Sequence, residues 1–165
     1  MEGKPVRESR TVMTQIVFPS DTNSLGTMFG GKVMEYIDKI GAIASTRHAR
    51  KPVVTASSDS LDFLEPIRLG EAIIIEAFVT WTHRSSMEVY VKVQSENLLT
   101  GELKLTATSF LTYVALDENG RPAPVPPIIP ETPEETALFQ SAPERYERRK
   151  MRKKLALEDR GGYRH

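Results

Sequence analysis

The chain has 165 residues, which suits one domain with a tail, and its hydrophobic fraction of 39% is enough to form a core. Its 22 basic and 22 acidic residues cancel, so net charge gives no general attraction to nucleic acid or to an anionic membrane. The absence of cysteine excludes disulfides, thiolate nucleophiles and cysteine-based metal sites. There is no apolar leader and no run of about 20 apolar residues, so we expect a cytoplasmic protein with no membrane partner.

The first fifty residues predict an arm, a strand, a loop and a long helix. Residues 1–10 are polar and suggest a flexible N-terminal arm. Thr11–Phe18 is rich in β-branched residues and stops before a proline, which predicts a strand. After a loop with turn-forming residues over 19–31, a helix is predicted from Lys32 to Arg47. Apolar residues surround most of this helix, so we expect it to be buried; its main stripe is Val33, Ile37, Ile40 and Ala44.

Four further strands are predicted from alternating apolar residues. In the second of them, Trp81 falls on the same face as Ile73. The connections are short, which favours antiparallel pairing because parallel crossovers need a dozen residues or more. One strand, one helix and four more strands indicate an α+β hotdog fold over residues 11–120, with a five-stranded antiparallel sheet wrapped around a long central helix. The four strand segments are Val53–Leu64, Glu71–Trp81, Met87–Gln94 and Leu103–Val114.

Residues 121–165 differ in composition from the rest of the chain. They begin with a stiff proline-rich exit, and a charged, partly helical tail follows. Ala142–Glu158 suits a helix with a dense basic face from Arg145 to Lys154. A solvated charged helix is the favoured interpretation of this run, and nucleic-acid binding is a weaker one.

A glycine pair marks the predicted start of the helix. Unpaired backbone N–H groups and the positive end of the helix dipole meet at Gly30 and Gly31, and a residue without a Cβ lets a ligand oxygen approach closely. Such a site suits the oxyanion of a tetrahedral intermediate. The alternative is that the glycines only turn the chain or allow close packing.

Asp38 follows Gly31 by two helical turns and lies on the same face, about 10 Å further along the axis at ~1.5 Å per residue. One helix therefore cannot easily present both groups to the same carbon atom. Two antiparallel copies of the helix can, which points to a site shared across a dimer interface. The alternative is an exposed Asp38 that pairs with Lys32 or Lys39.

Other polar residues are weaker signals. Asn23 precedes the glycines, and its amide can orient water or polarise a carbonyl, or it can simply form an Asx turn. Arg84 and the hydroxyls after it can meet an anionic ligand or form a polar hairpin. The three histidines are isolated, so we expect no metal site.

Three segments together carry a resemblance to a known family within Thr11–Leu116. They are the loop and helix from Phe18 to Asp38, the strand and loop from Val53 to Pro66, and the strand pair from Val79 to Val89. With them the chain resembles the hotdog-fold acyl-CoA thioesterases. Within that family it is similar to bacterial relatives of the mammalian cytosolic acyl-CoA hydrolase.

The resemblance implies hydrolysis of fatty acyl-CoA to a free fatty acid and CoA, with no cofactor beyond the CoA of the substrate. It implies that Asn23 and Asp38 come from opposite subunits of a double-hotdog dimer, and that the amide of Gly31 polarises the carbonyl. Asp38 can act as a general base on water or as a nucleophile through an anhydride, and the sequence leaves both open.

The resemblance also implies a homo-oligomer, a trimer of dimers, with CoA along the subunit interface. Residues expected to bind the substrate or its CoA portion are Gly30, Thr55, Ala56, Ser57, Arg84, Ser85 and Ser86.

Three rival functions remain. A hydratase or dehydratase of the same fold needs a histidine, and none lies between Asn23 and Asp38. A non-catalytic acyl-CoA sensor would bind without turnover. An RNA- or partner-binding module would use the basic tail. The acyl chain length is left open.

Overall fold

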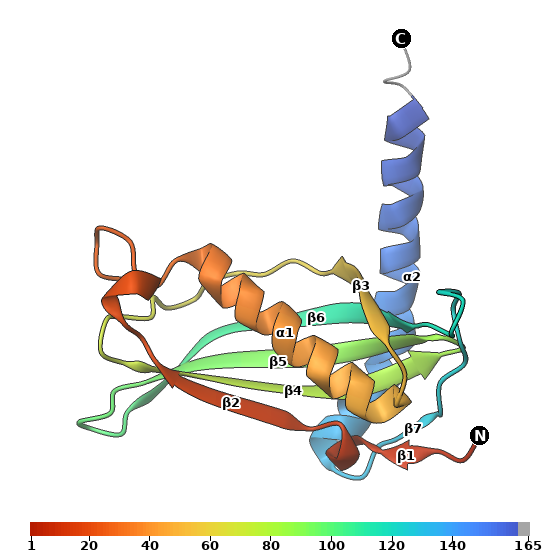
Figure 1. The fold of residues 1–165 in the computed structure, drawn as a ribbon, viewed down its shortest axis with the longest axis horizontal. Helices are drawn as coiled ribbons and strands as arrows, with labels where there is room; N and C mark the ends of the chain where they lie inside the picture. Colours follow the sequence, from red (N-terminus) through yellow and green to blue (C-terminus); the bar gives the residue numbers. More distant parts are fainter. Residues whose placement is uncertain (162–165) are drawn as a thin grey trace.

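The computed structural model describes residues 1–161, and the chain folds as one curved sheet with a helix on each face (Figure 1). The two long helices are α1 (Gly30–Ala49) and α2 (Pro133–Gly161). The strands are β1 (Lys4–Pro5), β2 (Thr11–Ile16), β3 (Val53–Ser58), β4 (Ala72–His83), β5 (Ser86–Glu96), β6 (Leu103–Ala115) and β7 (Ile128–Ile129).

The main sheet has five strands in the order β2-β4-β5-β6-β3, and every neighbouring pair is antiparallel. The central three strands follow one another through two tight hairpins, as their short connections predict. β2 and β3 lie on either side of these three strands and form the two edges of the sheet. In the sequence, β2 precedes α1 and β3 follows it. The predicted α+β architecture, five antiparallel strands around one long helix, is confirmed.

The core lies between α1 and the concave face of the sheet. The predicted stripe of the helix is buried, with each of its four side chains at most 3% exposed. Alternate residues of the central strands meet it, among them Ile75, Val79, Val89 and Val91, which are completely buried. Burying one such side chain contributes about 1.5–3 kcal/mol, so this interface is the main source of stability.

The face assigned to Trp81 is wrong, because a β-bulge interrupts the alternation. The register of β4 with β5 passes from Val79↔Val89 directly to Trp81↔Glu88, which leaves Thr80 as the extra residue. The bulge turns Trp81 to the outer face of the sheet, where its ring lies 5.4 Å from that of Tyr146 on α2.

β3 is shorter than predicted. It ends at Ser58 rather than Leu64, after a second bulge between Thr55 and Ser57. The chain then runs beside β6 as a loop, held where the Asp59 N–H donates to the carbonyl of Phe110 (2.9 Å). This loop matters below because it lines the candidate site.

The N-terminal residues are not a free arm in the structure. β1 pairs with β7 in parallel, and the Val6 side chain is only 1% exposed. The Lys4 ammonium donates to the backbone carbonyl of His48 (2.8 Å), at the C-terminal end of α1. The helix dipole favours cations at the C-terminal end of α1, so it stabilises the contact of Lys4 with that end. The proline-rich exit supplies the partner strand β7, so the two ends of the predicted domain depend on each other.

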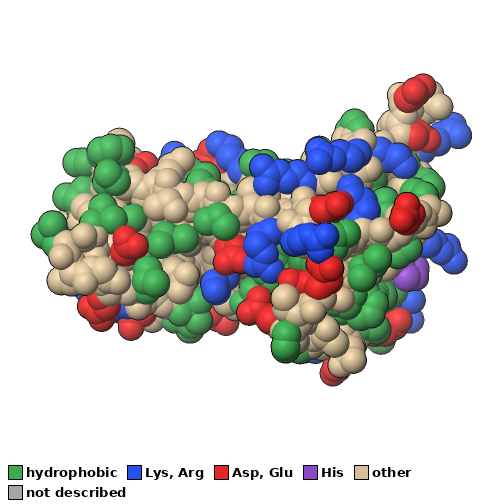
Figure 2. All heavy atoms as spheres, turned by 90° about the horizontal axis from the view of Figure 1, so that it is seen from below, with side chains coloured by type: hydrophobic (Ala, Val, Ile, Leu, Met, Phe, Trp, Pro, Cys, Tyr) green, Lys and Arg blue, Asp and Glu red, His purple; other side chains and the backbone are tan. Residues whose placement is uncertain are grey.

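α2 begins nine residues earlier than predicted and covers the outer face of the sheet with its first half. Ala142 is fully buried there, and the Arg145 guanidinium lies 4.0 Å from the centre of the Phe110 ring. From residue 150 to 161 every residue is exposed, and this half of the helix rises away from the body of the fold (Figure 1). On the face seen in Figure 2, Lys and Arg side chains gather across the middle with carboxylates among them, and hydrophobic side chains show on either side.

Candidate active site

The side chain of Asp38 is held by two hydroxyl groups from the sheet. The Thr55 hydroxyl on β3 donates to Oδ1 of Asp38 at 2.7 Å, and the Tyr113 hydroxyl on β6 lies 3.0 Å from the same oxygen. The Tyr113 hydroxyl also lies 2.8 Å from the backbone carbonyl of Asp38. None of residues 1–161 donates a hydrogen bond to Oδ2 of Asp38, so one carboxylate oxygen is fixed and the other is available to a ligand.

Tyr113 is a buried donor that sequence reasoning missed. Burial raises the pKa of its phenol above the usual value, and the negative charge of Asp38 adds to the effect. Tyr113 therefore keeps its proton at neutral pH and continues to donate.

Gly41 makes this contact possible. A Cβ placed on Gly41 would come within 2.8 Å of two ring carbons of Tyr113, so any larger residue would push the ring away. Gly41 lies three residues after Asp38 on the same helix face, and an interior glycine in an otherwise apolar helix was the one signal that could have shown the tyrosine's position.

A cavity of about 540 Å³ opens beside Asp38. The carboxylate and Thr55 lie on its wall, as does Gly31 at the start of α1. The rest of the wall is mainly apolar, formed by Met34, Ile37, Leu61, Phe63 and Leu111. An apolar cavity with a few converging polar groups is the usual form of a small-molecule site, and this one suits an acyl chain next to a reactive carbonyl.

The glycine pair forms the helix start, as predicted. α1 begins at Gly30, and a Cβ on Gly31 would meet no atom within 4 Å, so the backbone at Gly31 is open to a ligand. The ring of Phe63 lies over Gly30, where a Cβ would come to 3.4 Å. The helix dipole and unpaired N–H groups thus face the same cavity as the carboxylate.

Asn23 does not join Asp38 within one chain. Its side-chain oxygen accepts from the N–H of Leu25 (2.9 Å), and its side-chain nitrogen donates to the hydroxyl of Thr27 (2.9 Å). This is the Asx turn that the sequence left as an alternative. Asn23 does not line the Asp38 cavity of the same chain.

The other residues expected at the site are more scattered. Thr55 contacts Asp38, whereas Ala56 and Ser57 follow it on the edge strand β3 without lining the cavity. Arg84 and Ser85 form the tight turn between β4 and β5, where Arg84 has a φ of 54°, and Ser86 begins β5. Asp38 itself is exposed rather than enclosed by apolar neighbours.

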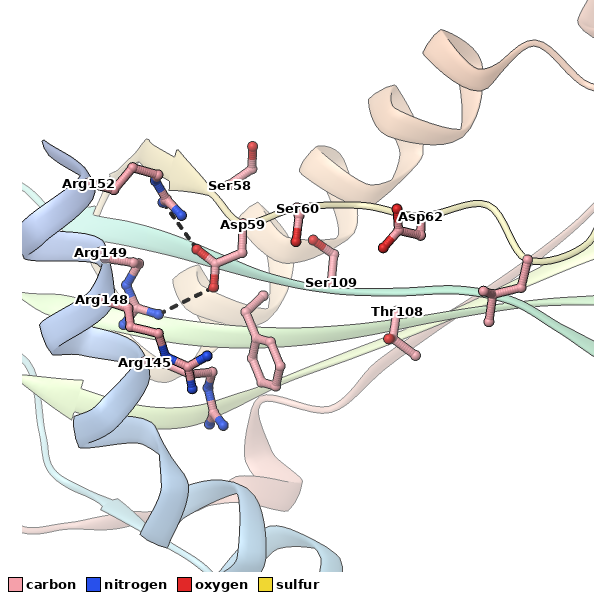
Figure 3. A pocket seen from close by; sticks show the side chains of 12 residues that line it. Ser58, Asp59, Ser60, Asp62, Thr108, Ser109, Arg145, Arg148, Arg149 and Arg152 are labelled. Carbon is pink, nitrogen blue, oxygen red and sulfur yellow. Dashed lines mark hydrogen bonds and ion pairs between the residues drawn. The ribbon is translucent and has the colours of Figure 1, made fainter. Parts of the chain in front are cut away.

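A second, larger hollow of about 920 Å³ lies on the α2 side of the same loop (Figure 3). Four arginines of α2 line it: Arg145, Arg148, Arg149 and Arg152. The prediction of a wholly solvated basic face is wrong for two of them. The side chains of Arg145 and Arg149 are only 13% and 9% exposed, because both bind the buried carboxylate of Glu88.

Among residues 1–161, no group of three or more His, Asp or Glu side chains is arranged to hold a metal ion. None of the helices described is both long and apolar enough to cross a membrane.

Comparison with protein families matches residues 25–102 to the thioesterase superfamily. A curated relative in Bacillus subtilis, named as an uncharacterized acyl-CoA thioester hydrolase, is 55% identical over 93% of this chain and 89% of its own length. The chain belongs to the thioesterase superfamily. The resemblance found in the sequence is confirmed.

A mammalian relative and solved structures agree with this superfamily assignment. The human cytosolic acyl coenzyme A thioester hydrolase is 35% identical over 88% of this chain, but the match spans only 39% of that longer protein. A solved hexameric acyl-CoA thioesterase matches with a TM-score of 0.90 and 55% identity, over 92% of this chain and 97% of its own. The hotdog fold is therefore shared with solved thioesterases.

A Staphylococcus aureus acyl-CoA hydrolase, solved with butyryl-CoA and CoA, has a TM-score of 0.93 and 41% identity, over 98% of this chain and 99% of its own. Three further structures of that enzyme carry alanine in place of an asparagine, an aspartate and a threonine. Those three positions are separated along that chain as Asn23, Asp38 and Thr55 are in this one.

Proposed function

We propose that this protein hydrolyses acyl-CoA thioesters to a carboxylic acid and CoA, using a site shared between two chains. The observation that carries the proposal is the Asp38 carboxylate, fixed through one oxygen by Thr55 and Tyr113 at the wall of an apolar cavity. The superfamily and the names of the relatives agree with this reaction class.

The free oxygen of Asp38 has two chemical uses. It can take a proton from water as the water attacks the thioester carbonyl, or it can attack that carbonyl itself and form an anhydride that water then opens. In both routes negative charge develops on the carbonyl oxygen, and in this proposal the backbone N–H at Gly31 stabilises it. The thiolate of CoA leaves when the tetrahedral intermediate collapses.

The separation of Gly31 and Asp38 by two helical turns, about 10 Å, supports assembly from two chains. Asp38 is exposed in the single chain, and β3, which carries Thr55, is an edge strand with a free side. A second chain would bring its Asn23 to hold the water or the thioester. Alanine substitutions at equivalently spaced positions of the S. aureus enzyme support the choice of Asn23, Asp38 and Thr55.

The remaining site predictions belong to the same proposal. We place the arm of the substrate's CoA along β3 at Thr55, Ala56 and Ser57, with Gly30 beside the thioester. Arg84, Ser85 and Ser86 line neither of the two hollows, so their predicted phosphate contact requires a neighbouring subunit. A trimer of dimers is supported by the hexameric relative, and a cytoplasmic location by the cytosolic mammalian one. The reaction uses water and needs no cofactor beyond the CoA of the substrate.

The test is thiol release from a panel of short to long acyl-CoAs by the wild type and by Asp38→Asn. The substitution should lower kcat by roughly 100-fold or more, because it removes the group that activates or replaces water. Glu35→Gln is the matched control: Glu35 lies on the same helix and lines the same cavity, but it is exposed and paired with Lys39 (2.8 Å). CoA binding without turnover in the wild type would instead make the protein a sensor. Unchanged turnover in Asp38→Asn would keep the reaction and reject the role of Asp38.

A further inference from the structure

The hollow under α2 adjoins the Asp38 cavity. Ser58, Asp59 and Ser109 line both. Ser58 ends β3, three residues after the threonine that binds Asp38, and Asp59 begins the loop that walls the apolar cavity. A ligand held at Asp38 can therefore extend around the end of β3 into the second hollow without leaving the surface of the chain.

The chemistry of the wall changes along this path. The first cavity is mainly apolar apart from its carboxylates and hydroxyls, and the far end of the second is lined by arginines of α2 (Figure 3). The hydroxyl groups of Ser58 and Ser109 lie where the two hollows meet, and those of Ser60 and Thr108 line the second. An acyl-CoA has the same order of parts: an acyl chain, a thioester, an arm with amide groups, and phosphates at the other end.

Two of the arginines hold α2 in place. Glu88 on β5 is completely buried as a side chain, and the Arg145 guanidinium donates to both of its oxygens (3.0 and 2.8 Å). Arg149 donates to Glu88 at 2.8 Å, and the hydroxyl of Thr80 adds a further bond at 2.7 Å. This network fixes the helix on the sheet and so fixes the position of the arginines on the turn that follows.

Arg148 and Arg152 lie one turn apart and are the available pair, 70% and 51% exposed. The nearest carboxylate to Arg148 is that of Glu144 at 3.7 Å, and an exposed pair of this kind contributes little. Arg152 contacts Asp59 through one nitrogen (3.2 Å), and Arg149 lies 3.6 Å from the same carboxylate. Asp59 and Asp62 also line the hollow, and Glu88 pairs with Arg145 and Arg149, so these four arginines face three carboxylates and keep an excess of one positive charge.

We propose that Arg148 and Arg152 bind the phosphate groups of the substrate's CoA portion. The assignment rests on the proposed thioesterase function and adds a phosphate contact within the chain that supplies Asp38. Guanidinium groups bind phosphate through paired charge-assisted hydrogen bonds, and the fixed helix reduces the cost of ordering them. A free nucleotide would offer the same phosphate chemistry, so the experiment must separate the two sources.

The experiment compares two substrates that carry the same acyl group, butyryl-CoA and butyryl-pantetheine. Only the first has phosphates. Arg148→Gln and Arg152→Gln should each raise KM for butyryl-CoA by roughly tenfold, with kcat nearly unchanged, because each removes one charge-assisted contact. KM for butyryl-pantetheine should stay the same. Lys154→Gln is the matched control, since it removes one cation from the same exposed stretch of α2 without touching the hollow.

Three results would overturn the assignment. The first is an unchanged KM for butyryl-CoA in the Arg148→Gln/Arg152→Gln double variant. The second is an equal loss with both substrates, which would make the arginines structural. The third is an effect of added ADP on butyryl-pantetheine hydrolysis that persists unchanged in the double variant, since the phosphates would then bind elsewhere.

The proposed function can fail separately. If the wild type hydrolyses neither substrate, the affinity for CoA measured by calorimetry tests the role of the two arginines without turnover. Weaker binding of CoA by the double variant than by Lys154→Gln would support the arginines even without turnover, and equal binding would reject them.

Discussion

Asp38 and Glu88 are both carboxylates held by donors from neighbouring elements, and they lie on opposite sides of the same sheet. Asp38 receives neutral hydroxyls on one oxygen, is exposed, and borders a cavity. Glu88 is completely buried, and both its oxygens are bound by arginines. Charged partners on both oxygens suit a group that holds elements together. Neutral partners on one oxygen orient a group and leave the other oxygen for chemistry.

The largest expected effect is a loss of stability when the buried Glu88 is neutralised. Glu88→Gln leaves the buried Arg145 without a counter-charge and Arg149 with only Asp59, 3.6 Å away, and breaking such a buried pair costs about 3–5 kcal/mol. Chemical denaturation should show this loss. The kcat per folded molecule at saturating acyl-CoA should stay near that of the wild type, and a specific loss of kcat in a fully folded variant would show that the two sides are not independent.

The next effect tests the fit of Tyr113 beneath α1. Gly41→Ala places a methyl group against the tyrosine ring, and overpacking of this kind costs about 1–3 kcal/mol. Unlike Glu88→Gln, this substitution should also lower kcat, since the ring that orients Asp38 must move. Ala42→Gly, at the neighbouring and partly exposed position, controls for changes in helix propensity. A Gly41→Ala variant with normal kcat would contradict the positioning role of Tyr113.

Tyr113→Phe removes only the hydroxyl and keeps the packing. We expect kcat to fall roughly tenfold, because one donor to Asp38 is lost while Thr55 remains. Thr55→Val is the complementary change at the second donor. If the two donors act on the same oxygen, the double variant should lose less than the product of the single effects. Steady-state kinetics at saturating acyl-CoA measures all three.

The smallest effect is in the pH dependence, at the end of α1 far from both carboxylates. Burial lowers the pKa of His48, whose Nε2 lies 2.7 Å from the carbonyl of Pro126. The folded state therefore binds this proton less readily than the unfolded state. The stabilisation is present above about pH 6.5 and is lost as the pH falls below that value. Thermal unfolding between pH 7.5 and 5 should show the loss, and His48→Gln should reduce the slope. An unchanged slope would exclude His48 as the cause.

Local sequence patterns were enough for the elements and their arrangement, because α1 and the central strands are set by periodicity and short connections. From the two helical turns between Gly31 and Asp38 they also predicted a site shared by two chains. That stays a prediction, and within one chain both residues line the same cavity. The patterns failed at Trp81, since a one-residue bulge reverses every later side chain while leaving the composition of the strand unchanged.

The contacts that position Asp38 and Glu88 could not be predicted from the sequence, because their partners are distant along the chain. Tyr113 is 75 residues from Asp38, and Arg149 is 61 residues from Glu88. A tyrosine in an alternating strand and a glutamate among valines look like ordinary strand residues until the fold places them. The docked N-terminus is a similar case, since β1 exists only because β7 returns beside it.

Gly41 also has a meaning for protein engineering. An interior glycine weakens a helix by about 0.5–1 kcal/mol relative to alanine, and replacing helical glycines is a standard route to a more heat-resistant enzyme. At this position the missing Cβ leaves room for the Tyr113 ring, which orients the Asp38 carboxylate. Replacing Gly41 with a better helix former would therefore lower activity even if it stabilised the helix. At the exposed Gly31, a side chain would only restrict access of the substrate to the backbone.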